Sequence, residues 1–173
     1  KQQVIAAFHP HMSGVLLDPV VGAAQAVQAG LIHHRGLLLE LEKADYGDKP
    51  VPLDLEMRPQ WSVEQIKRMG ADGVKVFFYY NSDQHEHAAR QEAKMQQVIH
   101  DCTRHDIPLY AEPIIYEASG ADMQRLVLEA ARRFAALSAD ILKLEFPIDS
   151  RAYPDEKDWT AACELLTASV DTP

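Results

Sequence analysis

The segment GVKVFFYYNSDQHEHAARQEAKMQQVIHDCTRHDIPLYAEP, residues 73–113, consists of two apolar runs joined by a long and mostly polar stretch. The runs at 73–80 and 107–113 are short and rich in β-branched and aromatic residues, which is typical of buried strands. The stretch between them has helical spacing from an N-cap at Asp83 to about His105. The segment therefore predicts a strand–helix–strand unit, whose two strands lie parallel in one sheet.

The same alternation continues on both sides of this segment. Three further strands are predicted at GVLLD (14–18), GLLLELE (36–42) and DILKLEF (140–146). Helices are predicted at residues 21–33, 61–69, 122–137 and 155–168, and residues 2–9 are interpreted as the end of another helix. No GxGxxG or GxxxxGK[ST] fingerprint follows any of these strands. The repeat therefore predicts an α/β fold of the (β/α) barrel type rather than a nucleotide-binding doubly wound sheet.

The composition is that of an ordinary globular protein. The chain has 173 residues, 47% of them hydrophobic, so we expect a single domain covering residues 1–173. A net charge of -9 without any Lys/Arg run argues against nucleic acid or an anionic membrane as a partner. No apolar stretch approaches the roughly 20 residues of a membrane span, and the N-terminus shows no signal-peptide core. The two cysteines, Cys102 and Cys163, have no zinc spacing, so we expect free thiols and a cytoplasmic location.

Charged residues interrupt the predicted strands near their carboxyl ends, which is where barrel enzymes place their active sites. Lys75, Glu112 and Lys143 come in phase from three consecutive strands. Strand periodicity also places Glu145 on the same face as Lys143. The other charges at these ends are Asp18, Glu40 and Glu42. We therefore expect these side chains to converge on one site.

The two lysines favour imine chemistry. Lys75 and Lys143 lie within apolar runs, so we expect both amines to be deep, where burial and a second nearby cation lower the pKa of a lysine. Such a lysine attacks a carbonyl to form a Schiff base, whose iminium is an electron sink for breaking the adjacent carbon–carbon bond. Glu112 lies on the strand between them and is the candidate proton shuttle. The alternative interpretation is structural, with the lysines pairing with Glu112 and Glu145 in a polar barrel mouth.

A metal site is the competing chemical interpretation. Close histidine pairs occur at His9 and His11, His33 and His34, and His85 and His87. No H-E-x-x-H motif is present, so we expect surface or helix-cap histidines and no metal cofactor. A metal-dependent carbon–carbon lyase would have to use the carboxylates alone, namely Asp18, Glu42, Glu112 and Glu145. The proline-rich loop at residues 43–60 is long enough to be an active-site loop.

Five motifs resemble a known family in their order and spacing. They are GVLLDP, LLLELEKADY, WSVEQIKRMGADGVKVFFYY, DIPLYAEPIIY and ADILKLEFP, which together extend from about residue 10 to residue 149. In these motifs the chain resembles the class I aldolases of the tagatose-1,6-bisphosphate aldolase type, whose relatives include sulfofructosephosphate aldolase. The resemblance implies a (β/α)8 TIM-barrel enzyme that cleaves a ketose 1,6-bisphosphate to dihydroxyacetone phosphate and glyceraldehyde 3-phosphate, without a metal or other cofactor.

The resemblance also implies roles for individual residues. Lys143 of LKLEFP would form the Schiff base, Lys75 of GVKVFFYY would be the second active-site lysine, and Glu112 of YAEP would be the acid/base. Asp18 and Glu42 match positions that line the site, and Glu145 faces it from the strand of Lys143. We therefore predict substrate-binding positions at Asp18, Glu42 and Glu145.

The extent of the resemblance predicts that this chain supplies about strands two to six of the barrel. The strands that carry phosphate-binding loops in such barrels would lie outside it. An open five-stranded piece has two unpaired edges, so we expect it to be part of a longer chain or to form a homo-oligomer. The partner is expected to be a small phosphorylated sugar. The alternative function is a non-catalytic, aldolase-like domain that binds a sugar phosphate as a sensor.

Overall fold

The computed structural model describes residues 1–43, 54–119 and 122–171. In these residues the strands form one parallel sheet in the order β1-β2-β3-β4-β5. The strands are β1 (Gly14–Leu17), β2 (Gly36–Glu40), β3 (Gly73–Tyr80), β4 (Leu109–Ile115) and β5 (Ile141–Leu142). The helices are α1 (Gln2–Phe8), a 3-10 turn η1 (His9–His11), α2 (Ala23–Gln28), α3 (Val63–Arg68), α4 (His85–Arg104), α5 (Met123–Ala136) and α6 (Glu156–Ala168).

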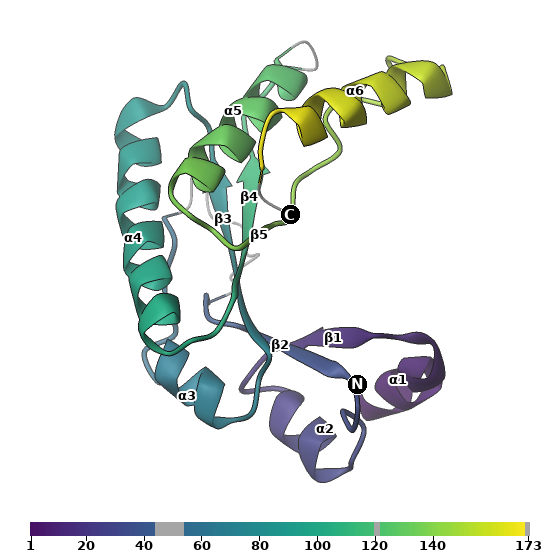
Figure 1. The fold of residues 1–173 in the computed structure, drawn as a ribbon, viewed down its shortest axis with the longest axis vertical. Coiled ribbons are helices and arrows are strands. Elements are labelled where there is room, and N and C mark those ends of the chain that lie inside the picture. Colours follow the sequence, from purple (N-terminus) through teal and green to yellow (C-terminus); the bar gives the residue numbers. More distant parts are fainter. Residues whose placement is uncertain (44–53, 120–121, 172–173) are drawn as a thin grey trace.

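The sequential strand order confirms the barrel prediction. A doubly wound sheet reverses its strand order at a switch point, whereas a (β/α)8 barrel adds each strand beside the preceding one. Figure 1 shows the sheet curving, with α3, α4 and α5 along one side and the N-terminal helices α1 and α2 near β1. The chain therefore forms an arc of a (β/α)8 barrel. No helix within the described segments is long and apolar enough to cross a membrane.

The element ends differ from the prediction for local reasons. The predicted strand at 140–146 is only two residues long, because the ladder to β4 meets a proline. After Lys143 N donates to the Ala111 carbonyl, the next donor on β4 would be residue 113, and Pro113 has no N–H. One step further, the Ile115 N–H donates at 2.6 Å to the Glu145 carboxylate instead of to a strand carbonyl. The chain therefore leaves the sheet at Lys143.

A second correction concerns the start of α4. Asp83 was expected to cap this helix, but the N-cap is Gln84, which makes no side-chain capping bond. The Asp83 carboxylate instead pairs with Arg125 on α5. The predicted helix at 61–69 does begin as expected, because the Ser62 hydroxyl accepts from the Gln65 N–H at 3.2 Å.

The two faces of the sheet have different surroundings. On the helix-covered face the strand side chains are 0–2% exposed, and they include Leu37, Leu39, Val74, Val76, Phe78, Leu109 and Ala111. They pack on helix residues such as Ile66, Met95 and Phe134, which are fully buried. On the concave face, register places Lys75 beside both Glu40 and Tyr110, and Glu112 beside Phe77. The charged strand-end residues therefore lie on the concave face.

Candidate active site

Lys75 is the centre of the charged cluster. It lies within β3, is only 6% exposed, and its Nζ atom is 3.0 Å from Glu42 Oε1 and 2.9 Å from Glu112 Oε2. The same ammonium lies 4.4 Å from the centre of the Phe77 ring. Burial alone would lower the pKa of Lys75, but the two carboxylates raise it above the ordinary lysine value. The expectation of a lowered pKa for Lys75 is therefore wrong.

Glu112 joins the two lysines. Its Oε2 atom pairs with Lys75 and its Oε1 atom pairs with Lys143. Burial would raise the pKa of this carboxyl, but its bonds to Lys143 and Lys75 lower it below the usual glutamate range. The structure thus brings together all three residues that were predicted from three consecutive strands.

Lys143 occupies the rim of the sheet rather than its interior. Its side chain is 65% exposed, on the edge strand of this five-stranded arc. The expectation that Lys143 starts deep in a low-dielectric environment is therefore wrong. Its amine is open to a ligand on one side and is held by Glu112 on the other.

Glu42 lies beyond the end of β2, where the chain pairs with residues 56 and 57 near the end of the long loop. Glu42 forms an antiparallel bridge with Met57, and the Lys43 N–H donates to the Glu56 carbonyl at 2.8 Å. The Glu42 side chain is 1% exposed, and its Oε1 atom accepts from Lys75 Nζ at 3.0 Å and from Phe77 N at 3.1 Å. Its Oε2 atom is buried and has no hydrogen-bond partner in the part of the chain that the structure describes. Burial raises the pKa of Glu42, and Lys75 only partly opposes this.

Asp18 and Glu40 are linked by an arginine that sequence reasoning missed. Arg58 Nη2 lies 2.8 Å from Asp18 Oδ2 and 2.9 Å from Glu40 Oε1. Although burial opposes it, backbone N–H bonds from Val20 and Val21 and the nearby Arg58 lower the pKa of Asp18. Burial and repulsion from the neighbouring acids raise the pKa of Glu40. No spacing pattern marks Arg58, since it reaches the strand ends from the loop at 43–60.

The predictions for Glu145 and for the long loop at residues 43–60 remain to be compared with the structure. Glu145 accepts from Ile115 N and, within the described segments, makes no ion pair with Lys75 or Lys143. The structural interpretation that paired both lysines with Glu112 and Glu145 thus holds for Glu112 only. The substrate-binding role of Glu145 stays a prediction. Most of the predicted active-site loop, residues 44–53, lies outside the described residues.

The histidines do not gather at this site. His87, which was expected at the surface or in a cap, is 5% exposed and is within 3.2 Å of the Tyr116 hydroxyl and 3.1 Å of Gln91 Nε2. Gln91 in turn binds Asp54 and the Leu55 N–H, at the return of the long loop. Within the described residues, no group of three or more His, Cys, Asp or Glu side chains is arranged to hold a metal ion.

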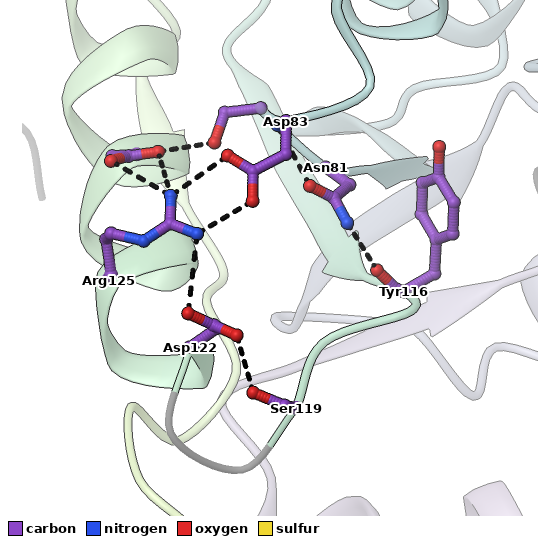
Figure 2. A network of polar contacts seen from close by, with 8 residues as sticks. Asn81, Asp83, Tyr116, Ser119, Asp122 and Arg125 are labelled. Carbon is purple, nitrogen blue, oxygen red and sulfur yellow. Dashed lines mark hydrogen bonds and ion pairs between the residues drawn. The ribbon is translucent and has the colours of Figure 1, made fainter.

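A second polar cluster ties together the loops that follow β3 and β4 (Figure 2). Arg125 forms a two-pronged pair with Asp83, at 2.7 and 3.1 Å, and also contacts Asp122 and Glu129. Asn81 donates to the Tyr116 carbonyl at 2.9 Å and accepts from the Asp83 N–H at 3.0 Å. These contacts hold the loops that follow β3 and β4 to each other and to the start of α5.

Comparison with protein families gives a match over almost the whole chain. A model described as DeoC/LacD family aldolase matches residues 1–169. A tagatose 1,6-diphosphate aldolase of Enterococcus faecalis is 32% identical over 166 residues, which cover 86% of this chain and 49% of that relative. A tagatose 1,6-diphosphate aldolase of Streptococcus mutans is 30% identical over 163 residues, covering 87% of this chain and 50% of the relative. The chain thus spans about half the length of these curated relatives.

Solved structures share the fold. An archaeal fructose-1,6-bisphosphate aldolase, with its catalytic lysine bound to the carbinolamine intermediate of the substrate, superposes with a TM-score of 0.67 and 19% identity. The match covers 98% of this chain and 61% of the archaeal one. A protein of Corynebacterium glutamicum superposes with a TM-score of 0.76 and 16% identity, covering 99% of this chain and 56% of the other.

Proposed function

The chain belongs to the DeoC/LacD family of aldolases, and from this premise we propose that it carries the lysine chemistry of a class I, Schiff-base-forming aldolase. The substrate would be a phosphorylated ketose such as tagatose 1,6-bisphosphate, cleaved to dihydroxyacetone phosphate and glyceraldehyde 3-phosphate. The observation that carries the proposal is the connected set of ion pairs in which Glu112 bridges Lys75 and Lys143. Imine formation, carbon–carbon cleavage and proton transfer need a nucleophilic amine beside a carboxylate, which this arrangement supplies.

Lys143 is the better nucleophile of the two lysines. Its side chain is 65% exposed, so a substrate carbonyl can approach its amine. Lys75 is buried and held by two carboxylates, so we assign it the role of electrostatic partner beside Glu112. The amine of Lys143 would add to the ketose carbonyl, and loss of water would give the iminium.

Cleavage then uses Glu112 as the base. Its carboxylate would take the proton of the hydroxyl group on the carbon beyond the bond that breaks, while the electrons of that bond flow into the iminium to leave an enamine. The hydroxyl-bearing half departs as an aldehyde. Protonation of the enamine carbon restores an iminium, which water hydrolyses to release the second product and the free amine.

The remaining assignments follow from position. We assign substrate-lining positions to Asp18, Glu42 and Glu145, and a single aldolase-type domain to residues 1–173. The two cysteines are unpaired, which supports a reducing, cytoplasmic compartment. The concave face carries partly exposed apolar side chains such as Leu38 and Tyr110, which supports completion by further chain or by a homo-oligomer.

The test is reductive trapping of the imine. The full-length protein is incubated with dihydroxyacetone phosphate and borohydride, and the adduct is located by intact mass and peptide mapping. A reduced adduct on Lys143 is expected, and omission of borohydride should leave no stable adduct. An adduct on Lys75 would reassign the nucleophile. A folded protein without any adduct would contradict the proposal and favour a sugar-phosphate-binding role.

A further inference from the structure

The structure raises a question about how Lys143 becomes a nucleophile. An amine must be neutral to attack a carbonyl, but Lys143 is exposed rather than deep and it is paired with the carboxylate of Glu112. The Lys143 amine donates to the Glu112 carboxylate, so it has to give up a proton before it can attack. Burial therefore does not activate this lysine, and the proton that it must lose needs an acceptor.

Glu112 is a poor final acceptor for that proton. It is the carboxylate that two ammonium groups hold, and those contacts lower its pKa. A carboxylate in this position transfers a proton more readily than it keeps one. A proton accepted from Lys143 therefore needs a further destination.

Glu42 has the properties of that destination. It is 1% exposed, its Oε2 atom has no hydrogen-bond partner among the described residues, and Lys75 is the cation beside it. A buried carboxylate with an unpartnered oxygen becomes more stable when it gains a proton and loses its charge. Burial also raises the pKa of Glu42, whereas that of Glu112 is lowered.

We propose that Glu42 is the final proton acceptor of the site, and that the proton lost by Lys143 reaches it through Glu112 and Lys75. The inference rests on the proposed aldolase function. The contacts form an unbroken line, since Glu112 touches both lysines and Lys75 Nζ is 3.0 Å from Glu42 Oε1. The relay uses side chains alone and needs no co-reactant.

The transfers balance. Lys75 gives one ammonium proton to Glu42 Oε1, and Lys143 gives one to Glu112 Oε1. Rotation of the Glu112 carboxyl about its Cγ–Cδ bond turns that proton towards Lys75, whose neutral amine takes it. Lys75 is again an ammonium and Glu112 a carboxylate, while Lys143 is a neutral amine and Glu42 a neutral acid. The reverse path returns the proton after product release.

Charged groups on the neighbouring elements constrain the test. Glu42 lies next to two charged groups, Lys75 on β3 and Glu40 on β2. Arg58, at the end of the long loop, pairs with Glu40. Glu112, on β4, is one strand further away. If Glu42 acted only through its charge, its removal would make positive charge in the cluster less stable and speed imine formation at neutral pH. The relay predicts the opposite sign, because removal leaves the proton without an acceptor.

The experiment measures the rate of trapping with dihydroxyacetone phosphate and cyanoborohydride from pH 6 to pH 10 in the full-length protein. Glu42→Gln keeps the shape and the acceptor for Lys75 but cannot take a proton. We expect it to trap about 100-fold more slowly near pH 7 and to recover as the pH approaches the ordinary lysine value of about 10.4. Glu92→Gln is the matched control, since Glu92 is a paired carboxylate in the outer layer that bonds Tyr80 and Arg133. Its pH profile should equal that of the wild type.

A second variant covers the case in which Glu42→Gln does not fold. Lys75→Arg keeps the positive charge, but a guanidinium does not release its proton, so the same alkaline shift is expected. Wild-type trapping at pH 7 by either variant would overturn the relay, as would loss of trapping at every pH in folded Glu42→Gln. Absence of an adduct in the wild type would instead overturn the aldolase function itself.

Discussion

The helix-covered face and the concave face of the sheet come from the same strands but are stabilised by different interactions. On the covered face, side chains such as Val74, Val76 and Phe78 are 0–2% exposed and pack on fully buried Met95 and Phe134. Burial of apolar surface stabilises that face, at about 25 cal/mol for each Å² removed from water.

The concave face carries charges at the same depth. Lys75 lies between Val74 and Val76 in β3, yet it points to the opposite side and meets Glu42 and Glu112. Desolvating such charges costs several kcal/mol for each ion in general, and their attraction offsets this only in part. The comparison teaches that the covered face provides stability, while the concave face keeps charges that stability alone does not require.

The largest expected effect comes from removing the nucleophile on the concave face. Lys143→Ala should reduce turnover by about 10⁴-fold or more, because no other exposed amine is held by Glu112 in the described part of the chain. The fold should be unchanged, since a side chain that is 65% exposed is not a packing residue. Steady-state kinetics and circular dichroism measure the two quantities.

The control for this variant is Lys67→Ala. Lys67 donates to the Asp106 carbonyl from the end of α3, on the amino-terminal side of the strands, so its loss should leave turnover intact. Full activity in Lys143→Ala would refute the assignment of the nucleophile.

The second-largest effect is expected from a substitution in the core of the helix-covered face. Phe134 is 0% exposed and packs on the rings of Phe78, at 4.7 Å between centroids, and Tyr80, at 5.0 Å. Phe134→Ala should lower the free energy of unfolding by about 3–5 kcal/mol, because it leaves a cavity in the core. Denaturant unfolding measures this loss. Trapping per folded molecule should stay near the wild-type rate, and a large selective loss of trapping would show that the two faces are not independent.

The fold was predictable because its signal is local. The apolar runs at 73–80 and 107–113 gave strands that agree with the structure within two residues, since continuous burial on a parallel sheet leaves a continuous apolar run. The early end of β5 was not predictable from periodicity. It depends on the missing N–H of Pro113 on the neighbouring strand and on the Glu145 side chain that binds Ile115.

The site was predictable in its membership but not in its electrostatics. Phase along three strands was enough to bring Lys75, Glu112 and Lys143 together. The direction of the pKa shift of Lys75 was not predictable, because it depends on which carboxylates approach Lys75 from other segments. Arg58 was missed for a related reason, since a loop residue that reaches two strand ends follows no period.

The third and smaller effect is a pH-dependent loss of stability when Glu112 on the concave face is replaced. The pKa of Glu112 is lowered in the folded state, so its ionised form stabilises the fold above the unfolded value near 4.5. Glu112→Gln should therefore destabilise the protein near pH 7 by about 1.5–3 kcal/mol, the value typical of hydrogen bonds to charged groups. The difference from the wild type should shrink as the pH falls below about 4.5 through the lowered folded pKa.

Glu42 provides the opposite trend for comparison. Its folded pKa is raised, so its contribution to stability is present at low pH and is lost as the pH rises through the folded pKa. The stability difference between wild type and Glu42→Gln should thus fall with rising pH, whereas the difference for Glu112→Gln should rise. Denaturant unfolding from pH 3 to pH 8 measures both, and parallel trends would contradict the assigned directions.

The smallest effect is expected where a charge cluster is exposed. The pair of Arg125 and Asp83 has good geometry, but its side chains are 42% and 57% exposed (Figure 2). Arg125→Gln should change the unfolding midpoint far less than Phe134→Ala does, and the change should vanish in about 1 M salt, where the screening length is about 3 Å. Asn81→Ala is the matched comparison within the same cluster. Asn81 is 3% exposed, and its loss leaves the Tyr116 carbonyl and the Asp83 N–H without their partner, so its larger effect should persist in salt. If salt abolished both effects equally, the burial of Asn81 would not explain why its contribution to stability exceeds that of Arg125.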